Sequence, residues 1–217
     1  MELYILLIVY GLLFLGELGD KTQLIVFNLA LEHKKAYKVG IGATMGFAII
    51  VTLSVFIGAV ITTFIPIILI SIVSGIIFIF IGLLEARDLK ESYEDHKDKD
   101  EQNTALPDSS ADSLESQDDR IPSKFQNLKN NPYLAGFGFI FLMELGDKSQ
   151  ILTITLASIY PHPLEVWLGS FLALTTLVWM GVFFGSAIAK KVPKFHLKLI
   201  SVILFIFIGI LILLTSF

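Results

Sequence analysis

Cysteine is absent from the 217 residues of this chain, which excludes a disulfide framework and any metal site built on thiolates. Polar sequence is also scarce. Apolar residues make up 54% of the chain, Phe alone occurs 18 times, and the mean hydropathy is +0.75. A soluble domain of this length carries far more polar surface. The composition therefore predicts an integral protein of the lipid bilayer. No nucleic acid partner is expected.

Six apolar runs account for most of the chain, and each is long enough for the roughly 20 residues that cross a bilayer core as a helix. They lie at about residues 3–31, 37–63, 66–86, 133–160, 164–189 and 194–216. Backbone groups find no water in lipid, so spans of this kind are helical. The first run begins directly after Met1-Glu2 without the positive region of a signal peptide, which favours a retained span. We therefore predict an all-α membrane protein with six transmembrane helices.

Charged residues are concentrated between the third and fourth runs. Residues 88–131 hold twelve acidic and six basic side chains and have no apolar period. This composition predicts disorder, at least from Asp98 to Asp119. We divide the chain into a first three-helix repeat at residues 1–87, an acidic linker at 88–131 and a second repeat at 132–217. A solvated tether is the preferred interpretation of the linker, and a regulatory or partner-binding segment is the alternative.

Lys and Arg are missing from both termini and from residues 62–66 and 161–165. Apart from two lysines in the motifs described below, all of them fall in three segments, at residues 34–38, 87–129 and 190–198. Six spans put these three segments on one side of the membrane. By the positive-inside rule the linker is cytoplasmic and both termini are outside. A prokaryotic plasma membrane is the expected location.

An offset of 127 residues superimposes the second half of the sequence on the first without a gap. Gly42 then meets Gly169, and residues 78–82 (FIFIG) meet the identical stretch at 205–209. Each half has three predicted spans, an odd number, so the second half enters the membrane from the opposite side. Such inverted-topology repeats are typical of transporters, whose substrate site lies near the midplane between the repeats.

Two seven-residue motifs interrupt the first and fourth runs, ELGDKTQ at residues 17–23 and ELGDKSQ at 144–150. A charged side chain at mid-bilayer costs roughly 2.5–3.5 kcal/mol on insertion scales, so the motifs predict a buried ion or proton site. The alternative is a structural ion-pair cluster that fixes the register of the helices. On a continuous helix the Glu, Asp and Gln of each motif share one face. Gly19 and Gly146 fall opposite, where they allow close helix contact or local unwinding.

Carboxylate and amide oxygens form a hard ligand set, which suits Mg²⁺, Ca²⁺ or Mn²⁺ rather than zinc or copper. The predicted metal ligands are Glu17, Asp20, Gln23, Glu144, Asp147 and Gln150. Their four carboxylates are also the predicted proton carriers, because burying uncompensated negative charge favours protonation and makes protons compete with the metal. The four histidines lie outside the spans and are assigned no metal.

Lys21 and Lys148 are predicted to balance charge, since each follows a motif glutamate by four residues and can pair with it on one helix face. With both lysines, the four carboxylates carry a net charge of −2, which one divalent cation neutralises. One transported divalent cation is thus the only metal expected, and no cofactor is predicted.

The doubled E-x-G-D-(K/R)-(S/T) motif resembles that of the small cation/proton exchangers, which include bacterial MneA-type manganese exporters and a Golgi manganese/calcium transporter. The resemblance covers both halves but not the linker. It implies two inverted repeats that move Mn²⁺ or Ca²⁺ out of the cytosol against protons. The matching positions are Glu17, Asp20, Lys21 and Thr22, with Glu144, Asp147, Lys148 and Ser149. Thr22 and Ser149 are expected to supply supporting hydroxyls, and both glutamines lie just beyond the motif.

Two other functions compete with an antiporter. Acidic residues also line passive divalent cation channels. An intramembrane aspartyl protease carries Gly-Asp within a span, but its G-x-G-D pattern is absent here because Glu17 and Glu144 stand at the first glycine position. We therefore expect no enzyme activity. The sequence leaves open the choice between Mn²⁺ and Ca²⁺, the proton stoichiometry and the oligomeric state.

Overall fold

The computed structural model describes residues 2–18, 20–33, 35–102, 131–191 and 194–215, and the regular structure within these ranges is α-helical. The helices are α1 (Leu3–Glu17), α2 (Lys21–Glu32), α3 (Ala36–Phe64), α4 (Ile67–Gln102), α6 (Pro132–Glu144), α7 (Lys148–Ile159), α8 (Pro163–Lys191) and α9 (Lys194–Thr215). The all-helical class is therefore confirmed.

Four of the six apolar runs coincide with single helices, namely α3, α4, α8 and α9. The first and fourth runs do not. Each is divided at its motif into two shorter helices, α1 with α2 and α6 with α7. One continuous helix through each motif, with Glu, Asp and Gln along one face, is thus not observed. The chain leaves the helical conformation at Leu18 and Leu145, whose ψ angles are 117° and 103°.

Among the residues that the structure describes, three helices are long and apolar enough to cross a membrane by length and composition: Ala36–Phe64, Ile67–Arg87 within α4, and Pro163–Phe183 within α8. Shorter apolar helices cover Leu3–Glu17, Pro132–Glu144 and Leu199–Leu214. Large apolar side chains cover the outer faces of the helices and are more than half exposed at repeat-related positions. They include Phe56 and Phe183 (68% and 65%) and Phe80 and Phe207 (59% and 63%). Such surfaces are suited to lipid.

Helix α4 continues past the boundary at residue 87 that we drew between the first repeat and the linker, and ends at Gln102. It therefore includes residues 98–102, where the composition predicts disorder. The rest of the predicted disordered segment, up to Asp119, lies outside the described residues.

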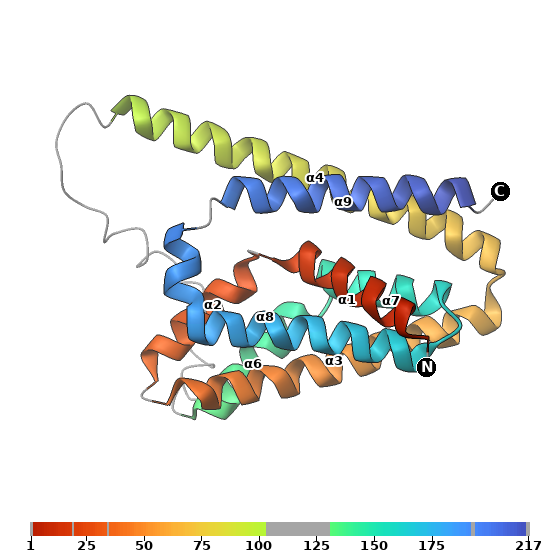
Figure 1. The fold of residues 1–217 in the computed structure, drawn as a ribbon, viewed down its shortest axis with the longest axis horizontal. Helices are drawn as coiled ribbons and strands as arrows, with labels where there is room; N and C mark the ends of the chain where they lie inside the picture. The colour runs from red at the N-terminus through yellow and green to blue at the C-terminus, as the bar shows by residue number, and fades with distance from the viewer. Residues whose placement is uncertain (1, 19, 34, 103–130, 192–193, 216–217) are drawn as a thin grey trace.

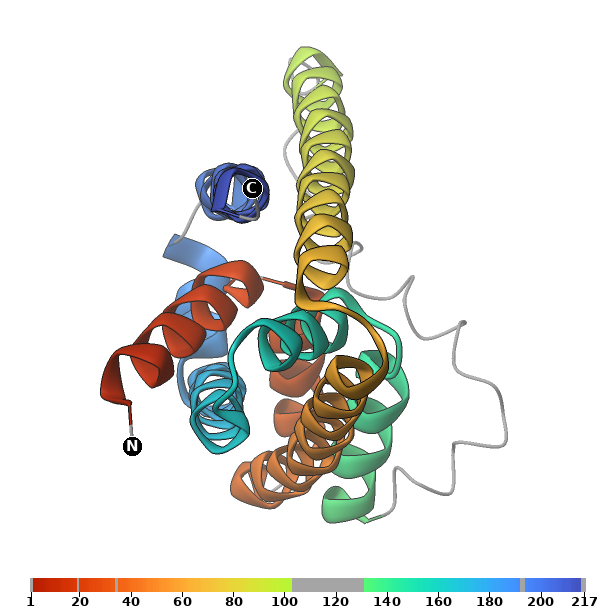
Figure 2. The same ribbon diagram turned by 90° about the vertical axis from the view of Figure 1, so that its right-hand side faces the viewer.

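Six of the helices form one bundle, and α4 and α9 pack against each other along one side of it (Figure 1, Figure 2). Within the bundle the two halves of the chain interleave. Helix α3 from the first half packs on α6 from the second, and α8 from the second half packs on α1 from the first. Neither half therefore forms a separate core.

Glycines let these crossing helices approach closely. A Cβ atom added to Gly42 on α3 would lie only 2.1 Å from the carbonyl oxygen of Tyr133 on α6. A Cβ added to Gly169 on α8 would lie 2.8 Å from the carbonyl oxygen of Leu6 on α1. Both members of the second contact are the repeat counterparts of the first, so one interhelical contact occurs twice. Small residues at such crossings are the usual means by which membrane helices pack.

The α4–α9 pair follows the same symmetry. Phe78 on α4 and Phe205 on α9 are each 1% exposed, and their ring centroids lie 6.2 Å apart. These two residues are each other's repeat counterparts, so each half supplies the same residue to this contact. Stacked rings in α1 (Tyr10 and Phe14) recur in α6, with the same centroid separation of 5.7 Å. The duplication seen in the sequence is therefore repeated in the packing.

A candidate cation site at two helix breaks

The two helix breaks share their helix end and one backbone hydrogen bond. Helix α1 ends at Glu17 and α6 ends at Glu144, and both side chains are buried, with exposures of 4% and 1%. The N–H of Asp20 donates to the Glu17 carbonyl at 3.2 Å, and the N–H of Asp147 donates to the Glu144 carbonyl at the same distance. Each motif thus closes one helix and opens the next with a single tight turn.

The second break shows why the motif divides a helix. Gly146 has φ of +91°, in the left-handed region that favours glycine after a helix end. Asp147 then caps α7, because its carboxylate accepts a hydrogen bond from the Lys148 N–H at 2.8 Å. The side-chain oxygen of Gln150 accepts from the Gly146 N–H at 2.6 Å and holds the turn from the other side. Of the two roles considered for Gly146, local unwinding is the observed one; Gly19 lies outside the described residues.

A hydrogen bond from one motif to the other fixes the Glu144 carboxylate. The hydroxyl of Thr22, in the first motif, donates to Glu144 Oε1 at 2.6 Å. The hydroxyl of Ser149 donates to Glu144 Oε2 at 2.5 Å. All three side chains are buried. Both supporting hydroxyls therefore act on the same carboxylate, and one of them comes from the opposite half of the chain.

Lys148 provides a second link between the motifs. Its ammonium lies 2.9 Å from Asp20 Oδ2 in the first motif and 2.5 Å from Glu85 Oε1 on α4. The predicted pairing of Lys148 with Glu144 along one helix face is wrong, because the break at Gly146 turns the lysine toward these other carboxylates. The side chain of Lys21 lies outside the described residues.

Sequence reasoning missed Glu85. The one available signal was its position, since it is an acidic residue inside the third apolar run, one residue before the predicted end of that run. Its contact with Lys148 spans 63 positions of sequence, a separation at which no helical periodicity applies.

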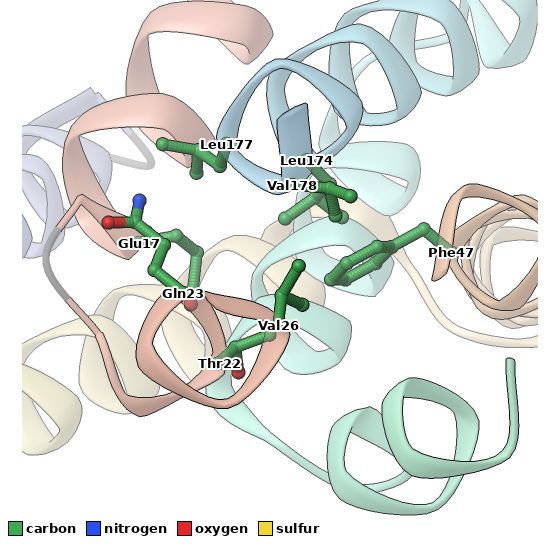
Figure 3. A pocket seen from close by; sticks show the side chains of 8 residues that line it. All are labelled: Glu17, Thr22, Gln23, Val26, Phe47, Leu174, Leu177 and Val178. Atoms are coloured by element: carbon green, nitrogen blue, oxygen red, sulfur yellow. The ribbon is translucent and has the colours of Figure 1, made fainter. Parts of the chain in front are cut away.

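Glu17 has a different environment from its counterpart Glu144. Its Oε1 atom is buried and has no hydrogen-bond partner among the described residues. The side chain borders a small pocket together with Thr22 and Gln23, and α3 and α8 supply most of the apolar wall (Figure 3). The apolar lining residues are Val26, Phe47, Leu174, Leu177 and Val178. The pocket therefore lies where helices from both halves meet.

Within the described part of the chain, no three acidic or histidine side chains stand close enough together to hold a metal ion. Three of the four motif carboxylates are instead engaged by groups of the protein: Glu144 by two hydroxyls, Asp20 by Lys148, and Asp147 by the first N–H of α7. The motifs contact each other, but they do not form a ready-made cage of oxygen atoms. The assignment of the six metal ligands stays a prediction.

Comparison with known proteins identifies the family. A family profile described as "Divalent cation/proton antiporter GDT1" matches residues 5–93 and 132–217, which include both motifs. The chain belongs to the GDT1 family. The resemblance inferred from the motifs is thereby confirmed. This GDT1 antiporter is an integral membrane protein and not an enzyme, and its transported substrates are divalent cations and protons.

Individual relatives of this GDT1 antiporter are distant but match most of its length. The chain is 26% identical to the GDT1-like protein C186.05c of Schizosaccharomyces pombe, over 90% of this chain and 84% of the relative. It is 28% identical to the GDT1-like protein sll0615 of Synechocystis, over 89% of each chain. It is 25% identical to GDT1-like protein 3 of Arabidopsis thaliana, over 91% of this chain and 66% of the relative. No solved structure matches the chain.

Proposed function

We propose that this GDT1 antiporter exports Mn²⁺ or Ca²⁺ from the cytosol in exchange for protons, through one site that both halves share. The reciprocal contacts between the motifs carry this proposal. Thr22 of the first motif donates to Glu144 of the second at 2.6 Å, and Lys148 of the second pairs with Asp20 of the first at 2.9 Å. Because each motif supplies a partner to the other, neither half holds a complete site alone.

The proposed ligands are oxygen atoms from both motifs, contributed by Glu17, Asp20, Gln23, Glu144, Asp147 and Gln150. Such a set suits a hard divalent cation. Glu17 Oε1 has no hydrogen-bond partner within the described ranges, which makes it the first oxygen available to an entering ion. The remaining carboxylates have to exchange their present hydrogen-bond and ion-pair partners for the metal.

Six spans are proposed for the membrane topology, with α1–α2 and α6–α7 each acting as one discontinuous span. At a rise of about 1.5 Å per residue, residues 3–32 reach roughly 45 Å if the two segments are roughly aligned, which is enough to cross a bilayer. Discontinuous helices at the midplane of inverted repeats are a common means of building ion sites in transporters. In this topology the linker is cytoplasmic, both termini are outside, and the membrane is a prokaryotic plasma membrane.

Exchange follows from competition for the same carboxylates. A site without metal or protons leaves several negative charges in low dielectric, a state that costs at least as much as one mid-membrane charge, roughly 2.5–3.5 kcal/mol. Only metal-loaded or protonated forms then rearrange between the two sides of the membrane. This coupling distinguishes an antiporter from a passive channel, whose pore conducts without such a requirement.

Reconstituted vesicles test the proposal directly. Purified protein is inserted into liposomes that carry an outward proton gradient, and uptake of Mn²⁺ is measured alone and in competition with Ca²⁺ or Mg²⁺. We expect the metal to accumulate above its external concentration and the accumulation to collapse with a protonophore. Metal that only equilibrates across the membrane, whatever the pH gradient, would indicate the passive channel instead.

A further inference from the structure

Lys148 joins two carboxylates that belong to different parts of the fold. Asp20 lies in the break between α1 and α2, and Glu85 lies on α4, outside the bundle that contains both motifs. The side chains of all three residues are largely buried, with exposures of 15% for Lys148, 20% for Asp20 and 14% for Glu85. The ammonium therefore occupies a position between two acidic groups, where a small cation is electrostatically favoured.

Cation binding by Asp20 requires a change in this arrangement. An ammonium already lies 2.9 Å from the Asp20 carboxylate, so a divalent cation has to displace it. A buried lysine that loses a carboxylate in direct contact with it is strongly disfavoured. Glu85 removes this obstacle, because it contacts the same ammonium at 2.5 Å and does not belong to either motif.

We propose that Glu85 is a positioning residue of the transport cycle, which keeps Lys148 paired while Asp20 exchanges the ammonium for the transported divalent cation. This inference rests on the proposed function, in which Asp20 is a ligand. Glu85 acts through Lys148 and does not itself bind the metal. Without it, the lysine stays on Asp20 and competes with the substrate.

Comparison of the two repeats shows that Glu85 occurs in the first half alone. The position 127 residues after Glu85 is Ile212, so the second half has no carboxylate at the equivalent place. A duplicated structural ion pair would appear in both halves. Glu85 is therefore not one half of a duplicated structural ion pair, which supports a role specific to Lys148.

Variants of the full-length protein test the role of Glu85. Glu85→Gln removes the charge but keeps the shape, and Lys148→Gln removes the ammonium. Glu165→Gln is the matched control, because Glu165 is also buried and hydrogen-bonded, to the Glu2 N–H at 3.1 Å, but lies on α8 away from Lys148. Mn²⁺ binding to the detergent-solubilised protein is measured by electron paramagnetic resonance, and apparent KM and maximal rate are measured in vesicles.

Glu85→Gln is expected to raise the Mn²⁺ dissociation constant and the apparent KM about tenfold, within the usual range for coupled sites, with the maximal rate changed far less. In a Lys148→Gln background the same substitution is expected to change neither constant. That comparison also decides the matter if Glu85→Gln alone fails to fold. An equal effect in both backgrounds, or no effect in wild type, overturns the inference. The binding measurement distinguishes this outcome from a failure of the proposed function. If the proposed function is wrong, the wild-type protein itself shows no Mn²⁺ movement driven by the pH gradient.

Discussion

Thr22 and Glu144 lie 122 positions apart and share a buried hydrogen bond of 2.6 Å. This bond connects the N-terminal turn of α2 to the last residue of α6, so it joins the helix breaks of the two halves. Ser149 occupies the other oxygen of Glu144, whereas one oxygen of Glu17 has no partner within the described ranges. Two carboxylates that are equivalent in the sequence therefore have different surroundings in the fold.

Removing the Thr22 hydroxyl tests the importance of this link. Thr22→Val keeps the side-chain shape but leaves Glu144 Oε1 without its donor, which costs about 1–3 kcal/mol for a buried polar group. We expect a lower thermal stability in detergent and a loss of most Mn²⁺ transport in vesicles. Thr22→Ser, which keeps the hydroxyl, should retain most of the transport. Thr44→Val is the control, because the Thr44 hydroxyl donates within its own helix, to the Gly40 carbonyl at 2.8 Å. Equal activities of the Thr22 and Thr44 valine variants would contradict the prediction.

A shared site predicts that the halves are not redundant. Asp20→Asn or Asp147→Asn alone should abolish most metal transport, because each removes a proposed ligand from the same site. Asp20→Asn also takes a counter-ion from Lys148. Initial rates in vesicles are compared with those of Glu2→Gln, a change at an exposed carboxylate near the N-terminus. A variant that keeps half of the wild-type rate would indicate two independent sites.

The two equivalent helix crossings predict that replacing the glycine at either one destabilises the protein. Gly42→Ala and Gly169→Ala each place a methyl group against a backbone carbonyl, 2.1 Å and 2.8 Å away, which the neighbouring helix can relieve only by moving. Overpacking of this kind costs about 1–3 kcal/mol. We expect both variants to lower the midpoint of thermal unfolding in detergent. Gly11→Ala is the control, since a Cβ there meets nothing within 4 Å, and it should be neutral or slightly stabilising.

Much of the fold could be predicted because hydropathy reports helix positions in a membrane protein directly. The predicted runs 37–63 and 194–216 differ from helices α3 (Ala36–Phe64) and α9 (Lys194–Thr215) by one residue at most. The repeat register also anticipates packing, since Gly42 and Gly169 make equivalent contacts. Both results follow from local composition and periodicity.

The helix breaks were anticipated only as one of two possible roles of the motif glycines, although the sequence carries a more definite signal. Each motif lies inside a long apolar run, and such a run favours one continuous helix. The pair Gly146-Asp147, however, is a helix stop followed by a helix start, with glycine in the left-handed region and aspartate as the cap of the next helix. The same Gly-Asp pair stands at positions 19 and 20. Local rules were therefore sufficient, but they were outweighed by the length of the apolar run.

Contacts between elements that are distant in the sequence could not be predicted, for a different reason. The ion pair of Lys148 with Glu85 depends on α4 lying beside the start of α7, and nothing local to either segment indicates this neighbour. A helical lysine four residues after a glutamate is expected to pair with it. Here the break redirected the side chain, and a carboxylate from another helix replaced the local partner.

The linker is predicted to be dispensable for transport. The family profile matches residues 5–93 and 132–217 and leaves the intervening residues unmatched. Replacing residues 103–125 with a Gly/Ser segment of equal length removes five of the twelve acidic residues of the linker and keeps the chain length between α4 and α6. We expect the Mn²⁺ flux in vesicles to stay within about twofold of wild type, since a flexible chain of equal length imposes little extra cost. A correctly inserted variant without flux would assign the linker a role in transport.

The last prediction concerns stoichiometry and depends on charge. Glu85 joins the four motif carboxylates and the two motif lysines, so the formal charge of the cluster is −3 when fully ionised, not −2. A bound divalent cation brings the cluster to −1, and so do two bound protons. The two loaded forms thus carry equal charge, whereas the empty form is penalised in low dielectric.

Exchange of one divalent cation for two protons then moves no net charge, and transport should respond to a pH gradient but not to the membrane potential. Vesicles clamped with potassium and valinomycin at a fixed pH gradient test this. A potential of about 100 mV is worth roughly 2.3 kcal/mol per transported charge, which corresponds to about a fifty-fold change in metal accumulation if one charge moves uncompensated. We expect the Mn²⁺ distribution to stay constant across such potentials. A shift of the expected size for one charge would mean that one or three protons, rather than two, return for each metal ion.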